Sequence, residues 1–227
     1  GTVLSPDEVP SLVDRDGDLC PAWRPFLTRC ALGRIDGDDV RRELRAQIDA
    51  LRGFGLELTH VDTHQNLHLW PSMARAVVEV ARQYDIPAIR ITRSDGRSPI
   101  ALAVRHFARR LENRSRSAGL EFPDATAGFD EAGRLDLTRL CDALTRLARQ
   151  GIASAELVCH PSEEGDDELD ALGWGYRGHD ELDALVSPRA RATVAGAGFR
   201  LGTFADLVDD GTPATPATKP EDREARR

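Results

Sequence analysis

The sequence at residues 59–68 reads THVDTHQNLH and places three histidines and an aspartate close together. The apolar-alternating run Leu56-Glu57-Leu58 precedes it, so the pattern predicts a strand over residues 56–62. If that strand continues, His60, Asp62 and His64 share one face, because side chains alternate between the two faces of a strand. Imidazole and carboxylate groups that converge are typical ligands of a divalent metal. We therefore predict a metal or catalytic site here; a polar, solvated loop is the alternative.

The residues after this cluster predict a turn and then a helix. Pro71 suits the first helical position, and apolar residues recur at helical spacing up to Tyr84. His68 is expected in the turn before this helix. The loop that leads from a strand into a helix is where α/β proteins hold their active sites, which supports a functional role for the cluster.

Helical and strand patterns alternate along the rest of the chain. Further helices are expected over residues 38–53, 100–117, 136–150, 179–185 and 188–197, and further strands over 87–92, 120–125, 155–159 and 199–201, with irregular structure up to residue 37 and a closing turn at 204–208. Such alternation predicts a parallel α/β sheet or a (β/α)-barrel-like fold.

Three of the predicted strands end at residues able to do chemistry. These are the histidine cluster, Arg90 with Arg93, and His160. Because parallel strands point the same way, we expect these ends to gather at one rim.

Composition limits the partners and the compartment. The formal net charge of −8 argues against nucleic acid or an anionic membrane as principal partner. The sequence shows neither a membrane span nor a signal peptide, so a cytoplasmic protein is expected. Four cysteines without a C-x-x-C pair predict reduced thiols. The Pro/Thr/Ala-rich tail, residues 211–227, is expected to be disordered.

The segment THVDTHQNLHLWP, residues 59–71, resembles the T-H-x-D-[ST]-H-x-H-x-H-x-x-P signature of YdjC-like carbohydrate deacetylases. IPAIR at 86–90 and ELVCHP at 156–161 resemble two more family segments, as do residues 4–14 and 181–207. The resemblance covers residues 1 to about 209. It predicts one YdjC-like domain over residues 1–210.

The resemblance implies a (β/α)-barrel-like fold and an enzyme that removes acetyl groups from N-acetylated amino sugars or a glycolipid. It also implies a divalent metal, Mg²⁺ or alternatively Zn²⁺, with His64 as a ligand. His160 and Asp62 are the catalytic candidates, and Arg90, His60 and His68 are the candidates for binding substrate. Trp174 and Tyr176 can stack on the face of a sugar.

The sequence also departs from the family pattern. Asn66 stands where the signature has a histidine, and the family's opening N-A-D-D-F-G strand and H-x-x-L-T segment have no counterpart. Those segments supply metal ligands and the catalytic base, so we expect an incomplete barrel. Its open sheet edges favour pairing with a second copy, a homo-oligomer. A catalytically impaired relative that binds a sugar or a partner protein is the alternative function; a phosphoesterase would require more aspartates.

Overall fold

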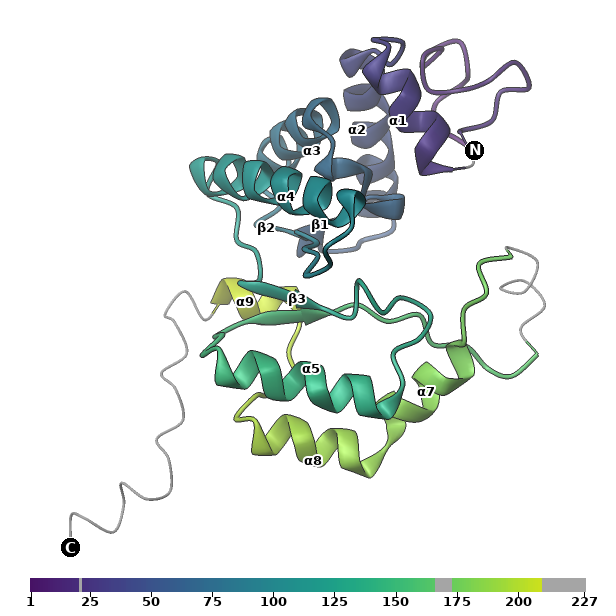
Figure 1. The fold of residues 1–227 in the computed structure, drawn as a ribbon. Coiled ribbons are helices and arrows are strands. Elements are labelled where there is room, and N and C mark those ends of the chain that lie inside the picture. The colour runs from purple at the N-terminus through teal and green to yellow at the C-terminus, as the bar shows by residue number, and fades with distance from the viewer. Residues whose placement is uncertain (21, 166–172, 210–227) are drawn as a thin grey trace, which may run out of the picture. The chain divides into compact units, whose positions relative to one another are not determined.

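The computed structural model describes residues 1–20, 22–165 and 173–209, so the tail predicted to be disordered lies outside the described residues. Within the span predicted as one domain, the chain forms two compact units. Unit 1 comprises residues 1–92 and 97–122, and unit 2 comprises residues 93–96 and 123–227. Figure 1 shows the elements of each unit.

Unit 1 is mainly helical and contains a short parallel strand pair. Its elements are α1 (Trp23–Ala31), α2 (Gly37–Gly53), β1 (His60–Val61), the 3-10 helix η1 (His64–Leu69), α3 (Pro71–Gln83), β2 (Ala88–Ile89) and α4 (Pro99–Ser117). Side chains that cap the first turn determine where α2 and α4 begin. The side chain of Asp36 accepts a hydrogen bond from the Asp38 amide at the start of α2, and that of Ser98 accepts from the Ala101 amide in α4.

Helix α1 lies in the region that was expected to be irregular. Pro25 looks like a helix breaker in the sequence, but it occupies the third position of α1. The first four amides of a helix have no partner within it, so a proline there removes no hydrogen bond.

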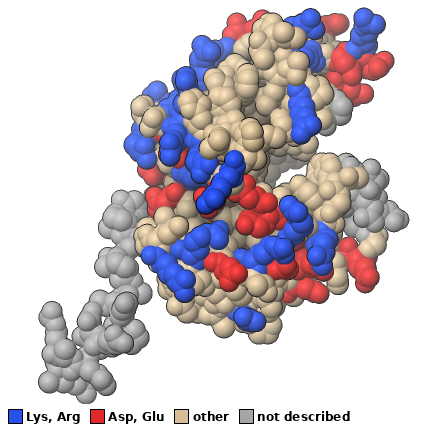
Figure 2. Space-filling model, in the orientation of Figure 1, with Lys and Arg blue, Asp and Glu red and all other residues tan. Residues whose placement is uncertain are grey.

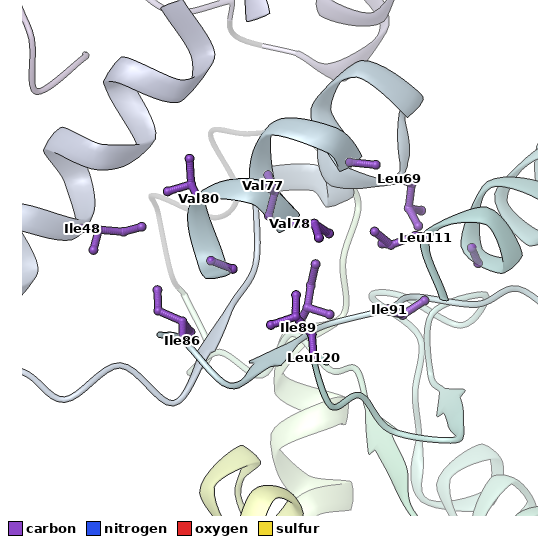
Figure 3. Close-up of a cluster of buried hydrophobic side chains, with 13 residues drawn as sticks. Ile48, Leu69, Val77, Val78, Val80, Ile86, Ile89, Ile91, Leu111 and Leu120 are labelled. Carbon is purple, nitrogen blue, oxygen red and sulfur yellow. The ribbon is translucent and has the colours of Figure 1, made fainter. Parts of the chain in front are cut away.

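The core of unit 1 forms where α3 packs over the strand pair. Strand β1 runs parallel to β2, with His60 opposite Ala88. Val77 and Val78 of α3 lie in one buried cluster with Ile89 and with Leu111 of α4 (Figure 3). Burial of each such side chain contributes about 1.5–3 kcal/mol, so this cluster fixes the strand ends in unit 1.

Unit 2 repeats the motif of a parallel strand pair covered by helices. Its elements are β3 (Ala125–Ala127), α5 (Leu137–Arg149), β4 (Ala155–Leu157), α7 (Gly178–Val186), α8 (Pro188–Gly196) and α9 (Phe204–Asp209). Strand β3 pairs with β4 in parallel, and α5 contacts both β3 and α8 (Figure 1).

Gly128, at φ +84°, follows β3, and a Cβ there would lie 2.1 Å from the Val158 carbonyl oxygen. The two chain segments beyond the strands therefore approach as closely as they do only because residue 128 is glycine.

Parallel pairing is confirmed in both units, and the predicted helices from residue 37 to residue 197 agree with the structure to within one residue at each end. The strands are shorter than predicted. The strand expected over residues 56–62 is reduced to His60–Val61, and the one expected over 120–125 gives way to β3 at Ala125–Ala127. No strand forms at residues 199–201, because the Phe199 amide bonds to the Val194 carbonyl in the turn that ends α8.

Two predictions from composition can be compared with the structure. All four cysteines are free thiols, as expected. Along the described ranges, no helix combines the length and the apolar character needed to cross a membrane.

Candidate functional site

The signature segment turns sharply after β1. The Thr63 amide donates to Oδ1 of Asp62 at 2.7 Å, and η1 begins at the next residue. Gln65 and Asn66 both adopt left-handed backbone conformations, with φ of 52° and 57°. The side chain of His64 is therefore presented from a turn and is exposed. The expectation that His60, Asp62 and His64 share a strand face is wrong, because the strand ends at Val61.

Asp62 and Arg90 come together at the ends of the two neighbouring strands. The Arg90 amide donates to the Val61 carbonyl at 3.0 Å, which extends the pairing of β2 with β1 by one residue. The Arg90 guanidinium then forms an ion pair with Oδ2 of Asp62. The two side chains thus lie at the same ends of the parallel strands β1 and β2, as expected, and the ion pair between them is an addition to that expectation.

His68 is fully buried, and both of its ring nitrogens are hydrogen-bonded. Nε2 lies 2.9 Å from the Arg90 carbonyl oxygen, which can only accept, so Nε2 carries the proton. Nδ1 accepts from the Thr63 hydroxyl at 2.8 Å, and that hydroxyl accepts in turn from the His68 amide at 2.9 Å. Burial lowers the pKa of His68, although Asp62, whose Oδ1 lies 3.6 Å from Nδ1, acts in the opposite direction. His68 was expected to bind substrate, but both of its ring nitrogens are bonded within the protein. The neutral imidazole instead holds the loop after β1 against the end of β2.

His60 lies on β1, directly before the turn. Its Nδ1 is 3.1 Å from the Thr59 hydroxyl, and the side chain is half-buried. Burial and the nearby Arg90 lower the pKa of His60, while Asp62 raises it. These effects favour a neutral imidazole, able to donate from one ring nitrogen and accept at the other.

Thr92 fixes the residue that replaces a signature histidine. Its hydroxyl, on a fully buried side chain, donates to Oδ1 of Asn66 at 2.5 Å. Asparagine tolerates the left-handed conformation better than most residues, which suits position 66. Neither Thr92 nor Thr63 was predicted as a site residue, since a threonine at a strand end is ordinary without knowledge of its partner.

His160 follows β4 in unit 2, and its main chain is held by a buried carboxylate. Oε2 of Glu181 accepts from the His160 amide at 2.5 Å, and Oε1 accepts from the Leu135 amide at 3.1 Å. Glu181 is fully buried and was not predicted as a site residue. The only sign of it in the sequence was an acid in the first turn of a predicted helix.

The His160 ring packs edge-on against Tyr176, and its Nδ1 is buried with no hydrogen-bond partner among the described residues. Its predicted gathering with the histidine cluster stays a prediction.

Arg93, expected at the same rim as Arg90, belongs to unit 2. Its guanidinium donates to the Pro123 carbonyl at 2.8 Å, and its amide donates to the Thr126 hydroxyl at 3.3 Å. These bonds tie the chain between β2 and α4 to β3, so Arg93 has a structural role here.

The donor set for a metal is incomplete in the part of the chain that the structure describes. No group of three or more His, Cys, Asp or Glu side chains there is placed to hold a metal ion. His64 is exposed and remains a candidate ligand, whereas the Asp62 carboxylate is already engaged by Arg90 and by the Thr63 amide. The described residues therefore do not by themselves fit a protein-held Mg²⁺ or Zn²⁺.

A groove of about 650 Å³ lies elsewhere in unit 1, between α3 and α4. Its walls combine apolar side chains with the exposed arginines 75, 82, 110 and 114, and Figure 2 shows basic side chains gathered over this part of the surface. None of the predicted site residues lines it. The site is thus built from strand ends and loops, and this groove is separate from it.

Comparison with known proteins places these residues in a family. Residues 1–196 match the family model described as YdjC-like protein. Chitooligosaccharide deacetylases from Yersinia pestis (strain Pestoides F) and Yersinia pseudotuberculosis serotype O:1b (strain IP 31758) are each 30% identical over 199 residues, which is 87% of this chain and 71% of each relative. A solved structure, titled as that of a proposed cellobiose-phosphate cleavage protein from Enterococcus faecalis V583, superposes with a TM-score of 0.71 at 20% identity. It covers 91% of this chain and 72% of its own, which shows a shared fold. The chain belongs to the YdjC-like family.

Proposed function

We propose that this chain is a carbohydrate N-deacetylase, which hydrolyses the acetamide group of N-acetylated amino sugars. The observation that carries the proposal is the ordered Asp62–Arg90 pair, held by His68, which joins the signature segment at 59–71 to the segment at 86–90 within the part of the chain that matches the family. The relatives named as chitooligosaccharide deacetylases match over 199 residues, which is 87% of this chain. N-acetylated chitooligosaccharides are therefore the first substrates to test.

Amide hydrolysis requires a base, a proton donor and groups that hold the carbonyl. Water adds to the acetyl carbonyl carbon, the C–N bond breaks, and acetate and a protonated amine are released. Asp62 is the proposed acceptor of the proton from water, and His160 is the proposed donor to the nitrogen. Arg90 and His60 are proposed to bind the acetyl oxygen and the sugar hydroxyls, since both can donate hydrogen bonds. His68 acts through Thr63 and the Arg90 carbonyl as a positioning residue.

The divalent ion expected from the resemblance stays a prediction, with His64 as its candidate ligand. Because the described residues do not complete its donor set, none of the steps above depends on it.

The same incomplete donor set favours a second candidate function. If acetate release requires the ion, a chain without a full set of ligands would bind carbohydrate at the same site without releasing acetate. This alternative predicts measurable oligosaccharide binding with no reaction.

Acetate release from N-acetylated chitooligosaccharides tests the proposal directly. We expect Asp62→Asn and His160→Gln each to lower kcat by about 10²–10⁴-fold, the contribution of a positioned acid or base. The matched controls are His106→Gln and His179→Gln, which change exposed histidines on α4 and α7. Full activity in Asp62→Asn and His160→Gln would sink the assigned roles, and binding without acetate release in the unaltered chain would favour the alternative.

A further inference from the structure

Two aromatic side chains of unit 2, Trp174 and Tyr176, form a row of rings with His160, the candidate proton donor. The Trp174 and Tyr176 rings have centroids 5.4 Å apart, inclined at 55°. The Tyr176 and His160 rings follow with centroids 4.9 Å apart at 61°. Trp174, the outermost ring, is 43% exposed, while Tyr176 and His160 are partly buried. The row therefore runs from the surface to the unpartnered Nδ1 of His160.

Two glycines allow the segments that carry these rings to lie close to their neighbours. Gly133, at φ +74°, lies directly against Tyr176, since a Cβ at 133 would lie 2.2 Å from Cδ1 of that ring. The Arg177 amide donates to the Gly133 carbonyl at 2.7 Å and fixes the two segments together. A Cβ at Gly178 would lie 2.1 Å from the Ser162 hydroxyl oxygen, so the segment after His160 is equally close. The Tyr176 ring is thus supported by the main chain at Gly133.

We propose that Trp174 and Tyr176 form a pyranose-binding subsite beside His160, where Trp174 stacks on the face of the sugar unit next to the one that reacts. The inference rests on the proposed function and adds a specificity-determining residue to it. An exposed indole offers a large flat apolar surface together with an N–H donor, a combination suited to a sugar that has an apolar face and a polar rim.

Tyr176 has a different task from Trp174. It separates the indole from the imidazole and packs on both. Loss of the Tyr176 ring should therefore disturb the orientation of His160 and lower kcat, whereas loss of the Trp174 ring should weaken only the binding of an additional sugar unit. We therefore expect substitution of Tyr176 to lower kcat and substitution of Trp174 to raise KM for substrates with the additional sugar unit.

The test measures kcat and KM for N-acetylated chitobiose and chitopentaose. We expect Trp174→Ala to raise KM for the pentamer by about tenfold, the upper range for an aromatic stacking contact, with kcat nearly unchanged. Trp174→Phe should recover most of the affinity. Phe54→Ala removes an exposed aromatic ring of unit 1 and is the matched control, expected to match the unaltered chain. An unchanged KM in Trp174→Ala, or a loss confined to kcat, would overturn the subsite.

Titration calorimetry with chitopentaose separates this inference from the proposed function. If the unaltered chain binds the pentamer and releases no acetate, weaker binding by Trp174→Ala supports the subsite although deacetylation has failed. If both proteins bind equally, or neither binds, the subsite is refuted. Circular dichroism of each variant, with Trp174→Phe as the conservative change, distinguishes a lost contact from a lost fold.

Discussion

At the scale of single residues, the loop after β1 combines backbone strain with a tight hydrogen-bond network. A left-handed conformation costs an ordinary residue roughly 1–2 kcal/mol, and Gln65 and Asn66 adopt it in succession. Bonds from Thr63 to His68 and from Thr92 to Asn66 hold the loop in this state. Strain that neighbouring contacts maintain is typical of functional sites, and here it directs the His64 side chain outward.

Gln65→Gly should relieve this strain. Glycine adopts φ near +52° freely, and the gain exceeds its entropic cost, so we expect the free energy of unfolding to rise by about 0.5–1 kcal/mol. Urea denaturation of the two proteins measures the change. Gln65→Ala is the control, since it keeps the Cβ and should give no gain; equal stability of the Gly and Ala variants would contradict the strain argument.

His68 should make stability depend on pH. Its folded pKa is lowered from the ordinary value of 6.5, so below that pH the unfolded chain binds a proton that the folded chain does not. Stability is therefore fully present above about pH 6.5 and falls as the pH decreases, by up to about 1.4 kcal/mol per unit for one such histidine. The lowered pKa of His60 acts in the same direction. Urea midpoints between pH 7 and pH 5 measure the slope.

The variant His68→Gln should be less stable at pH 7, because Nδ1 no longer accepts from Thr63, and should show a shallower pH slope. His106→Gln, an exposed histidine, should keep the slope of the unaltered chain. A His68→Gln slope equal to that of the unaltered chain would show that His68 is not the responsible group.

The sequence predicted that Asp62 and Arg90 lie at the same rim, because parallel register aligns the ends of their strands, but it did not predict the ion pair between them. It did not predict the burial of His68. The partner of its Nε2 is the Arg90 carbonyl, 22 positions away, and such a partner has no local signal in the sequence. The same holds for Thr92, whose bond to Asn66 spans 26 positions.

At the scale of elements, helices were predictable because their determinants are local. Asp36, Ser98 and Asp136 each cap the helix that follows, and each lies where the apolar period begins. The strands were predicted too long because pairing with a distant partner decides where a strand ends. Strand β1 ends at Val61, since the next residues turn into η1 and no longer pair with β2.

Glu181 of α7 should stabilise unit 2 through its two acceptor oxygens. In Glu181→Gln the amide nitrogen would face either the His160 or the Leu135 amide and leave that donor unsatisfied. We expect a loss of about 1–3 kcal/mol in the free energy of unfolding, measured in urea. Asp183→Asn makes the same chemical change at an exposed position of α7, 68% accessible, and should be close to neutral. Equal effects would contradict the anchoring role of Glu181.

At the scale of the whole molecule, the alternation of patterns was sufficient to predict an α/β protein with parallel strands. It was not sufficient to predict two compact units. The segment Arg93–Gly96 belongs with unit 2 because the Asp130 carboxylate accepts from the Ser94 hydroxyl and from the amides of Asp95 and Gly96. Such an assignment depends on contacts between distant positions, which periodicity does not encode.

Binding of a divalent ion is a prediction for the whole chain, because it depends on donors from several segments. With His64 as a candidate ligand and no described group of three donors, we expect weak binding of Mg²⁺ and Zn²⁺ in titration calorimetry. His64→Ala should weaken it by a further tenfold or more, whereas His106→Ala should have no effect. Tight binding that survives His64→Ala would place the metal elsewhere and remove His64 from the site.

Gly133 also bears on how this family can vary. A Cβ at position 133 would meet both the Tyr176 ring and the Cα of residue 176, which lies 2.9 Å away, and φ of +74° strains any residue other than glycine there. Among relatives that keep this loop, position 133 should therefore stay glycine whatever residue stands at 176, whereas position 176 is free to change alone. A lineage that replaced the tyrosine would lose the ring between indole and imidazole in a single substitution. The residue at 176 beside an unchanging glycine would therefore record where, in the history of the family, the packing on His160 was gained or lost.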